Sequence, residues 1–178
     1  MRIGIDISQL AYEETGVSNY LFKLLVNLFK IDKKNDYILF FSSLRRDLPL
    51  FIESKLREGN RATIKKFKFP PTFLEIIWNK YHSFPIERFV GDVDIFITSD
   101  WTEPPSRNAK KATIIYDLVV YKNPQETSSK IVETHKRKLK WVKMESDLIF
   151  CISEASKKDA MEILGIEEKR LKVIYPGI

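Results

Sequence analysis

Residues 3–7 read IGIDI, and this stretch decides the fold more than any other part of the sequence. Its alternating isoleucines are β-branched, which favours a strand. A turn-like segment follows from Ser8 to Gly16, and Ser18 is placed to cap a helix. Apolar residues then recur at helical spacing and predict one buried helix face: Tyr20, Leu21, Leu24, Leu25 and Leu28. This order of strand, turn and helix begins the alternation that is typical of a parallel sheet flanked by helices.

The same alternation of short apolar runs and longer helix-period segments continues along the chain. Six further strands are expected at 37–41, 62–67, 93–98, 112–116, 148–152 and 171–175. Helices are expected at 18–28, 47–57, 74–81, 128–144 and 154–164. Residues 1–178 are therefore predicted to form one doubly wound, Rossmann-like α/β domain. Its mostly parallel sheet should have about seven strands, with helices on both faces.

The composition is that of an ordinary soluble globular protein. The sequence has 178 residues, of which 44% are hydrophobic and 30% charged, and this suits a single domain with its own core. Asp6 interrupts any apolar secretion signal, and no window approaches the roughly 18 uncharged apolar residues of a membrane-spanning helix. We therefore expect a soluble cytoplasmic protein.

Disulfide and metal chemistry are not expected. Cys151 is the only cysteine, which excludes an internal disulfide and fits a reducing compartment. The two histidines, His82 and His135, lie far apart in sequence, and with one cysteine they do not supply a standard zinc ligand set.

The net charge of +6 leaves three kinds of anionic partner open, namely nucleic acid, acidic lipid and a phosphate-bearing substrate. Residues 130–144 form a basic amphipathic helix of the kind that lies on anionic membranes. Its basic residues include Lys136, Arg137, Lys138, Lys140 and Lys143. The plainer alternative is a surface helix with a lysine-rich outer face, in which His135 packs on the apolar side.

In an open parallel sheet, ligands bind beyond the carboxyl ends of the strands. This rule selects the loops 8–18, 99–105, 117–127 and 153–156. In the first loop, Gly16 stands ahead of a helix, where it lets the backbone approach a ligand and the helix start offers N–H groups to an anion. The alternative is a glycine that merely turns the chain. The G-x-G-x-x-G pattern is missing, so NAD is not expected.

The other loops hold polar and aromatic candidates. Asp117 can accept hydrogen bonds from sugar hydroxyls, or it can serve a turn. Ser153 and Ser156 follow the sixth strand, and a helix cap is the simpler interpretation of both. Trp101, in a proline-rich loop, can stack on a sugar ring or cover the edge of the core.

Four stretches, in this order, resemble the N-terminal domain of the retaining glycosyltransferases of family 4, which have the GT-B fold. Residues 2–6 and 15–20 (TGVSNY) look like the opening strand and glycine loop, which commonly reads GIGRY in mannosyltransferase-like branches. Residues 113–118 look like the family's HDL segment, and 151–159 (CISEASKKD) are similar to its VSEFSKRD segment. Residues 165–178 resemble the stretch that leads into the second domain.

The resemblance implies a retaining, metal-independent hexosyltransferase that uses a nucleotide sugar. This domain would bind the acceptor, a glycan or lipid-linked sugar of the cell-envelope polysaccharide type, and would itself hold no cofactor. The nucleotide-sugar donor would bind to a C-terminal domain with paired glutamates, which is the expected partner. That domain is not part of the sequence, so the chain is expected to be inactive alone. A peripheral contact with the anionic inner face of the membrane is compatible with such an acceptor.

The same resemblance implies roles for individual residues. Tyr116 and Asp117 would be catalytic, although the family typically has histidine where Tyr116 stands. A tyrosine hydroxyl donates a hydrogen bond to a sugar oxygen but does not act as a base near neutral pH. Substrate contacts are implied for Gly16, Val17, Asn19, Trp101, Ser153, Glu154 and Ser156.

Two other functions stay open. One is a stand-alone basic module for an anionic membrane surface or nucleic acid. Nucleic acid is the less expected of these, because the aromatic residues mostly fall at core spacing and are not clustered for base stacking. The other is a nucleotide- or sugar-phosphate-binding enzyme complete in itself, which the lack of a phosphate loop, Walker lysine and catalytic triad disfavours.

Overall fold

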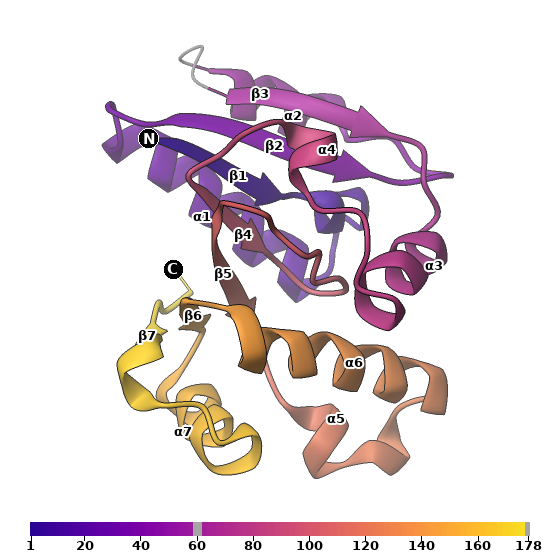
Figure 1. Ribbon diagram of the computed structural model, residues 1–178. Coiled ribbons are helices and arrows are strands. Elements are labelled where there is room, and N and C mark those ends of the chain that lie inside the picture. Colours follow the sequence, from indigo (N-terminus) through magenta and orange to yellow (C-terminus); the bar gives the residue numbers. More distant parts are fainter. Residues whose placement is uncertain (59–61, 177–178) are drawn as a thin grey trace.

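The computed structural model describes residues 1–58 and 62–176, and its centre is a seven-stranded parallel sheet (Figure 1). The strand order is β3-β2-β1-β4-β5-β6-β7, and every neighbouring pair is parallel. The strands are β1 (Arg2–Asp6), β2 (Asp36–Ser42), β3 (Ala62–Phe67), β4 (Ile95–Thr98), β5 (Lys110–Ile115), β6 (Leu148–Cys151) and β7 (Leu171–Val173). The predicted α/β fold is confirmed. Gly177 and Ile178, at the end of the stretch that resembles a domain connection, lie outside the described residues.

Strand β2 shows why this sheet is covered on both faces. Every residue after Asp36 in this strand is buried, as its uninterrupted apolar character predicts. Side chains alternate across a strand, so Leu39 and Phe41 join one core while Ile38 and Phe40 join another. The two faces therefore need separate layers of helices.

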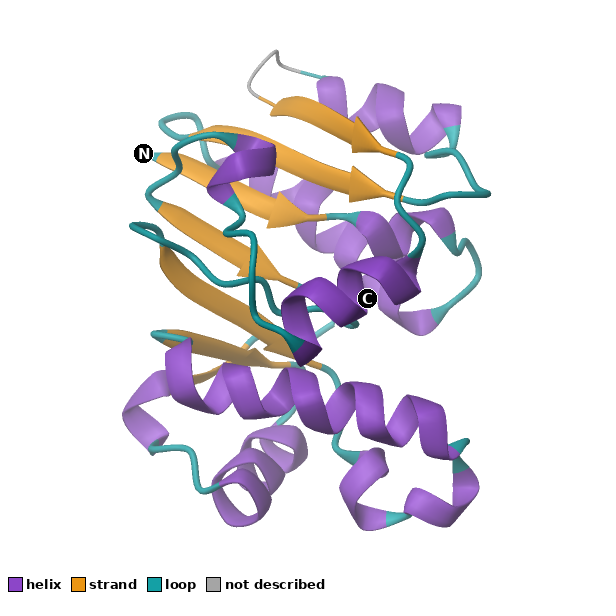
Figure 2. Cartoon of the chain, turned by 45° about the vertical axis from the view of Figure 1, so that its right-hand side comes forward, coloured by secondary structure: helices purple, strands orange, loops and turns teal. Residues whose placement is uncertain are grey.

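Helices fill both layers, as Figure 2 shows. One face is covered by two helices, α1 (Gly16–Ile31) and α2 (Leu50–Arg57). The other is covered by three short ones, α3 (Pro71–Leu74), the π-helix η2 (Glu75–Lys80) and α4 (Glu87–Val90). A third core around β6 is enclosed by α6 (Ser129–Glu145) and α7 (Glu154–Leu164). The remaining helical turns are η1 (Ser8–Ala11), α5 (Val119–Lys122), η3 (Pro124–Glu126) and η4 (Glu168–Arg170).

The segment before α4 departs from its prediction. The sequence predicts a regular helix over 74–81, but most of this segment is the π-helix η2. Its last hydrogen bond runs from the Tyr81 N–H to the Ile76 carbonyl, five residues back, at 3.0 Å. The wider turn buries the consecutive residues Trp78 and Asn79. A regular α-helix has 3.6 residues per turn, so the side chains of adjacent residues point further apart around its axis than they do in this π-helix.

The ends of several elements also differ by a few residues. Helix α1 begins at Gly16 because Thr15 is the N-cap, so the predicted cap at Ser18 is wrong. The Oγ1 of Thr15 accepts a hydrogen bond from the Ser18 N–H at 3.2 Å. Helix α2 begins at Leu50 rather than 47, after Pro49 in extended backbone with ψ of 134°. The carboxyl ends of the strands lie within two residues of their predicted positions.

Candidate functional site

The strand order reverses between β1 and β4. From β1 the chain moves outward to β2 and β3, and it then returns to β4 on the other side of β1. In open α/β sheets, ligands bind at this topological switch point, beyond the carboxyl ends of the strands. Two pockets open at this edge of the sheet, and Val17 in the first turn of α1 lines both.

The first pocket, here called the switch-point pocket, has a volume of about 500 Å³. Residues at or just after the ends of β1, β2 and β4 line it, namely Asp6, Ser42, Asp100 and Trp101. Helices α3 and α6 close its sides with Thr72 and Thr134. Of the residues predicted from the sequence, Val17 and Trp101 lie here.

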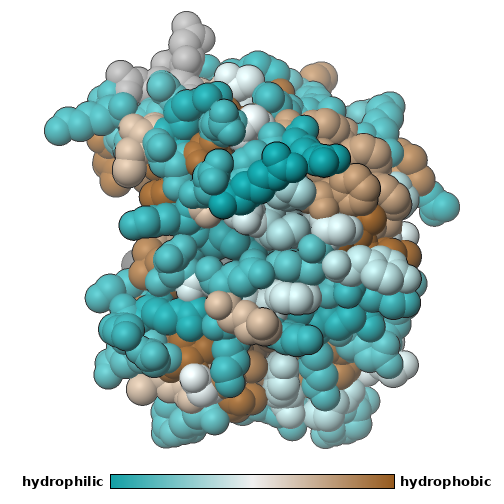
Figure 3. Space-filling view, viewed as in Figure 1, coloured by the Kyte–Doolittle hydropathy of each residue, from teal (hydrophilic) through white to brown (hydrophobic). Residues whose placement is uncertain are grey.

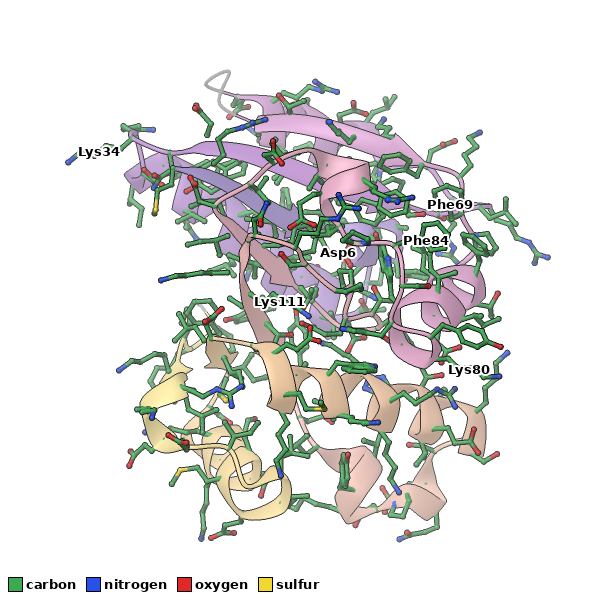
Figure 4. All side chains as sticks on the ribbon, in the orientation of Figure 1. Asp6, Lys34, Phe69, Lys80, Phe84 and Lys111 are labelled. Carbon is green, nitrogen blue, oxygen red and sulfur yellow. The ribbon has the colours of Figure 1, made fainter. Side chains whose placement is uncertain are left out.

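Asp6 and Asp100 bring two carboxyl groups to the switch-point pocket. Asp6 is only 6% exposed, and its Oδ1 accepts a hydrogen bond from the Ser8 N–H at 2.9 Å. Burial raises the pKa of both carboxyls; the hydrogen bonds from Ser8 are the main opposing cause for Asp6, and the positive charge of Lys138 is the main one for Asp100. Figure 4 shows Asp6 in the middle of the molecule, near the edge of the sheet that faces α6.

Lys138 is a buried cation whose charge lowers the pKa of both carboxyls. The sequence places it among the basic residues of a solvent-facing helix surface, but in the structure it is 2% exposed. Its Nζ donates a hydrogen bond to the carbonyl oxygen of Ser99, in the loop after β4. Burial lowers the pKa of Lys138, and the nearby carboxylates of Glu103, Asp100 and Asp6 oppose that effect. Lys138 is therefore not part of the lysine-rich outer face of α6.

The second pocket, here called the Gly16 pocket, has a volume of about 610 Å³. It gathers five of the residues predicted from the sequence, namely Gly16, Val17, Asn19, Tyr116 and Asp117. These come from the start of α1 and from the end of β5, which lie far apart in the chain. Lys23 from the second turn of α1 adds a positive charge to the lining.

The fold does not require a glycine at position 16. Its backbone is outside the left-handed region, and a Cβ built on it would meet nothing within 4 Å. It lies in the first turn of α1, where backbone N–H groups have no partner within the helix. One of them, from Ser18, binds the Thr15 cap. A side chain would therefore fit at this position without a steric clash.

Tyr116 and Asp117 differ in how they reach the Gly16 pocket. The Tyr116 hydroxyl lies 3.0 Å from Ser99 Oγ, and its ring packs edge-on against Tyr20 with centroids 5.6 Å apart. Burial raises the pKa of Tyr116, so the hydroxyl stays protonated and can act only as a hydrogen-bonding group. Asp117 is exposed, and its Oδ1 accepts a hydrogen bond from the Val119 N–H at 3.0 Å. Asp117 thus serves a turn as well as lining the pocket.

The predicted residues after β6 line neither pocket. Ser153 is the N-cap of α7, and its Oγ accepts a hydrogen bond from the Ser156 N–H at 3.0 Å. The Oγ of Ser156 donates to the Tyr116 carbonyl at 2.9 Å, and Glu154 is exposed. The cap interpretation holds for Ser153, and Ser156 supports the backbone beside the Gly16 pocket.

Trp101 is fixed in the wall of the switch-point pocket. Its carbonyl accepts a hydrogen bond from Asn79 Nδ2 at 2.8 Å, which ties the loop after β4 to η2. Its ring packs edge-on against His135 on α6, with centroids 5.0 Å apart. Burial lowers the pKa of His135, which packs as its place on the apolar stripe predicts.

Asp6 and Asp100 line the switch-point pocket and Lys138 lies near them; none of the three was predicted, although each carried a signal. Asp6 is the only charged residue in the apolar run 3–7, and Asp100 closely follows β4. Lys138 is spaced four residues from Thr134 and from Val142, which are both buried. A charged residue that is spaced four positions from buried residues on both sides lies on the buried face of its helix, which indicates a buried charge.

Comparison with known proteins adds no family. No family model matches the chain, and no curated protein matches it. Among residues 1–58 and 62–176, no cluster of three or more acidic, histidine or cysteine side chains is placed to hold a metal ion. No helix in the same ranges is both long and apolar enough to cross a bilayer. The evidence for function is therefore the geometry of the two pockets.

Proposed function

We propose that the chain is the acceptor-side domain of a retaining, metal-independent glycosyltransferase of family 4. It would act in transfer of a hexose from a nucleotide sugar to a glycan or lipid-linked acceptor. The observation that carries the proposal is the meeting of two pockets at the first turn of α1, at the carboxyl edge of the sheet. Group transfer between two sugars needs two adjoining subsites, because the reacting atoms must be held about 3–3.5 Å apart.

The Gly16 pocket suits the anionic part of the donor. The helix start offers backbone N–H groups, Gly16 leaves room for a close approach, and Lys23 supplies positive charge. Such groups stabilise a departing nucleoside diphosphate without a metal ion. A second domain with paired glutamates would close over this pocket and hold the rest of the donor, so the chain would be inactive alone.

Tyr116 and Asp117 are the residues to which we assign the chemistry in this pocket. The protonated hydroxyl of Tyr116 would donate a hydrogen bond to a sugar oxygen, and it would not take a proton. The exposed carboxylate of Asp117 would accept hydrogen bonds from sugar hydroxyls. Both lie beside Gly16, where the donor phosphate would sit.

The test uses the complete reading frame that encodes this chain. The purified protein is assayed for release of nucleoside diphosphate from UDP-glucose, UDP-galactose and GDP-mannose, with glycan and lipid-extract acceptors. Asp117→Asn should lower kcat/KM by about 10–100-fold, because a lost hydrogen bond to a charged group costs about 1.5–3 kcal/mol. Asp159→Asn is the control, since Asp159 lies outside both pockets and pairs with Lys122 at 3.1 Å. No transfer from any donor, or equal effects of the two variants, contradicts the proposal.

A second candidate function, peripheral contact with an anionic bilayer, is favoured by an apolar patch on one side of the molecule (Figure 3). We call it the α3 patch, and its exposed side chains are Phe73, Ile76, Tyr81 and Phe84. Two cations stand at its aromatic rings, Lys80 Nζ at 5.4 Å from Tyr81 and Arg88 at 5.5 Å from Phe84. Aromatic and basic side chains together suit the headgroup region of an anionic membrane. Figure 4 shows Phe84 and Lys80 on the side of α3.

Helix α6 is less suited to this contact than its sequence suggests. Its apolar residues Val132, Leu139 and Val142 are buried in the core around β6. The exposed side of the helix is mostly charged and carries one large exposed apolar side chain, Met144, which is too little to insert into a bilayer as an apolar face. In this second candidate function, the α3 patch and not α6 would contact the membrane.

Vesicle co-sedimentation tests the second candidate. The double variant Phe73→Ser with Phe84→Ser should weaken binding to phosphatidylglycerol vesicles by at least about tenfold, because burying one such side chain contributes about 1.5–3 kcal/mol. The control is Ile31→Ser with Leu50→Ser, which removes two side chains that are 79% and 84% exposed elsewhere on the surface. Equal losses in the two double variants would show that the α3 patch is not the contact.

A further inference from the structure

The switch-point pocket carries acidic groups although the whole chain is basic. Its lining includes the carboxyls of Asp6, Glu75 and Asp100, against a single lysine, Lys130. Glu75 is paired with Arg137 at 2.7 Å, so the remaining acidic lining is that of Asp6 and Asp100, which the charge of the buried Lys138 offsets only in part. A phosphate group placed here would meet like charges in a partly desolvated site. The Gly16 pocket next to it is less acidic, since Lys23 stands against the single carboxylate of Asp117 and the start of α1 adds N–H groups.

The two aspartates are held in place from behind. Asp6 accepts the Ser8 N–H, and it ends a strand that is hydrogen-bonded on both sides. Lys138 fixes the backbone before Asp100 through its hydrogen bond to the Ser99 carbonyl. Polar groups that are positioned before a ligand arrives bind it without a further ordering cost. Both carboxyls are therefore prepared as hydrogen-bond partners.

The remaining lining is aromatic and uncharged. Trp101 and Tyr12 add ring faces or edges, and Gln9, which is 8% exposed, adds an amide. A sugar ring has apolar C–H faces that pack on aromatic rings, and hydroxyls that donate to carboxylates and bond with amides. A cavity of about 500 Å³ lies within the usual size range for small-molecule sites. Aromatic, carboxyl and amide groups in one such cavity match an uncharged polyhydroxy ring.

We propose that the switch-point pocket binds an uncharged sugar ring and discriminates against phosphorylated sugars, with Asp100 and Asp6 as hydroxyl acceptors and Trp101 as the packing surface. This inference rests on the proposed function, in which it assigns the acceptor's sugar to one pocket and the anionic part of the donor to the other. It also states a chemical class for the acceptor: the residue that receives the hexose carries no phosphate on its own ring.

The experiment is a titration of the ¹⁵N-labelled chain followed by amide chemical shifts. The probes are methyl α-D-mannopyranoside, methyl β-D-glucopyranoside, mannose 6-phosphate and glucosamine. The uncharged glycosides should shift the amides of Gln9 and Thr102 and the indole N–H of Trp101. Mannose 6-phosphate should bind this pocket at least about tenfold more weakly. Glucosamine, whose ammonium group would be drawn to the carboxyls, should bind no more than a few times more tightly than the uncharged glycosides.

Two variants and one control make the result specific. Asp100→Asn should weaken binding of the uncharged glycosides at least about tenfold. It should also reduce the difference in affinity between these glycosides and mannose 6-phosphate. Trp101→Leu should weaken both uncharged glycosides while it leaves the carboxyls in place. Asp159→Asn should change neither, since Asp159 lies outside both pockets. The amide spectrum of each variant reports whether it is folded.

Three outcomes overturn the inference: glycoside shifts confined to the Gly16 pocket, no shift at the highest soluble glycoside concentration, or equal binding of mannose 6-phosphate. A strong preference for glucosamine would replace the uncharged sugar by a cationic ligand and also overturn it. These outcomes can be distinguished from those of the transferase assay. If glycosides bind as expected but the complete reading frame transfers no hexose, the pocket assignment stands and the transferase proposal falls.

Discussion

Glu103 Oε1 lies 3.0 Å from Lys111 Nζ, and both side chains are withdrawn from solvent, with 0% and 5% of their surface exposed. Lys111 also pairs with Glu145 Oε2 at 2.8 Å, and Thr98 Oγ1 donates to Glu103 Oε2 at 2.5 Å. This network joins the loop after β4 to β5 and to the end of α6. Because Trp101 belongs to that loop, the ion pair supports a wall of the switch-point pocket.

Glu103→Gln should lower the free energy of unfolding by about 3–5 kcal/mol, because it leaves the Lys111 charge buried with one carboxylate fewer. Urea titration followed by far-UV circular dichroism measures the change, and an unaltered m value shows that the same surface unfolds. Glu167→Gln is the matched control, since it removes a carboxylate from the exposed pair with Lys169. The control should show no measurable loss. Equal losses in both variants would contradict the structural role of the buried pair.

Two glycines should respond in opposite ways to alanine. A Cβ on Gly4 would lie 2.5 Å from Cδ2 of Phe96, a ring that is 1% exposed, so Gly4→Ala should cost about 1–3 kcal/mol of unfolding free energy. A Cβ on Gly16 meets nothing within 4 Å, so Gly16→Ala should leave stability unchanged or slightly raised. Thermal unfolding of the two variants measures the difference. In the complete reading frame, Gly16→Ala should still lower kcat/KM, since the new methyl group would stand where the donor phosphate approaches.

Gly16→Ala thus separates two roles for this glycine. A loss of stability similar to that of Gly4→Ala would show that Gly16 serves the fold. Unchanged stability with unchanged kcat/KM would show that no ligand approaches the backbone at this place.

The thiol of Cys151 should be inert while the protein is folded. It is 0% exposed, and burial raises its pKa to about 11. At pH 8, three pH units below that value, about one thiol in a thousand is ionised, and the thiolate is the reactive form. Iodoacetamide should therefore modify the chain only in denaturant, as mass spectrometry would show. Rapid alkylation of the native chain would mean that β6 is more open than the structure shows.

The sheet could be predicted because each strand carries its own signal. The run 37–41 is apolar throughout, as a strand buried on both faces requires. The π-helix η2 could not be predicted, since hydrophobic spacing assumes 3.6 residues per turn and Asn79 is polar. Asn79 is buried for its hydrogen bonds to the loop after β4, which only the tertiary structure reveals.

The Gly16 pocket was predictable in most of its residues and the switch-point pocket was not. The rule that ligands bind beyond the carboxyl ends of strands selects Gly16 and Asp117 from the sequence. It does not distinguish a buried carboxyl such as Asp6 from a capping one. Lys138 was assigned to the solvent, because lysine is almost never fully buried unless it is paired. Its partners come from β1 and from the loop after β4, far away in sequence.

Lys138→Met gives a prediction with a definite dependence on pH. The folded-state pKa values of Asp6 and Asp100 are raised above the ordinary value of 3.8, and Lys138 holds them down. Removing its charge raises both pKa values further, so ionising these carboxyls then costs more in the folded state than in the unfolded state. The stability loss should be greatest near pH 8, on the order of 1–3 kcal/mol, since the variant also leaves the Ser99 carbonyl without its hydrogen-bond donor. It should shrink as the pH falls toward 3.8, because both carboxyls become protonated in the folded state of wild type and variant alike, so that their ionisation no longer separates the two proteins.

Urea titrations of wild type and variant between pH 8 and pH 4 measure this dependence. Lys143→Met on the exposed side of the same helix is the control, and its effect should be small at every pH. A loss for Lys138→Met that stays constant with pH would mean that the side chain matters for packing and not for its charge. A loss that grows toward acid pH would reverse the sign of the linkage, and the charge of Lys138 would then not be what lowers the pKa values of Asp6 and Asp100.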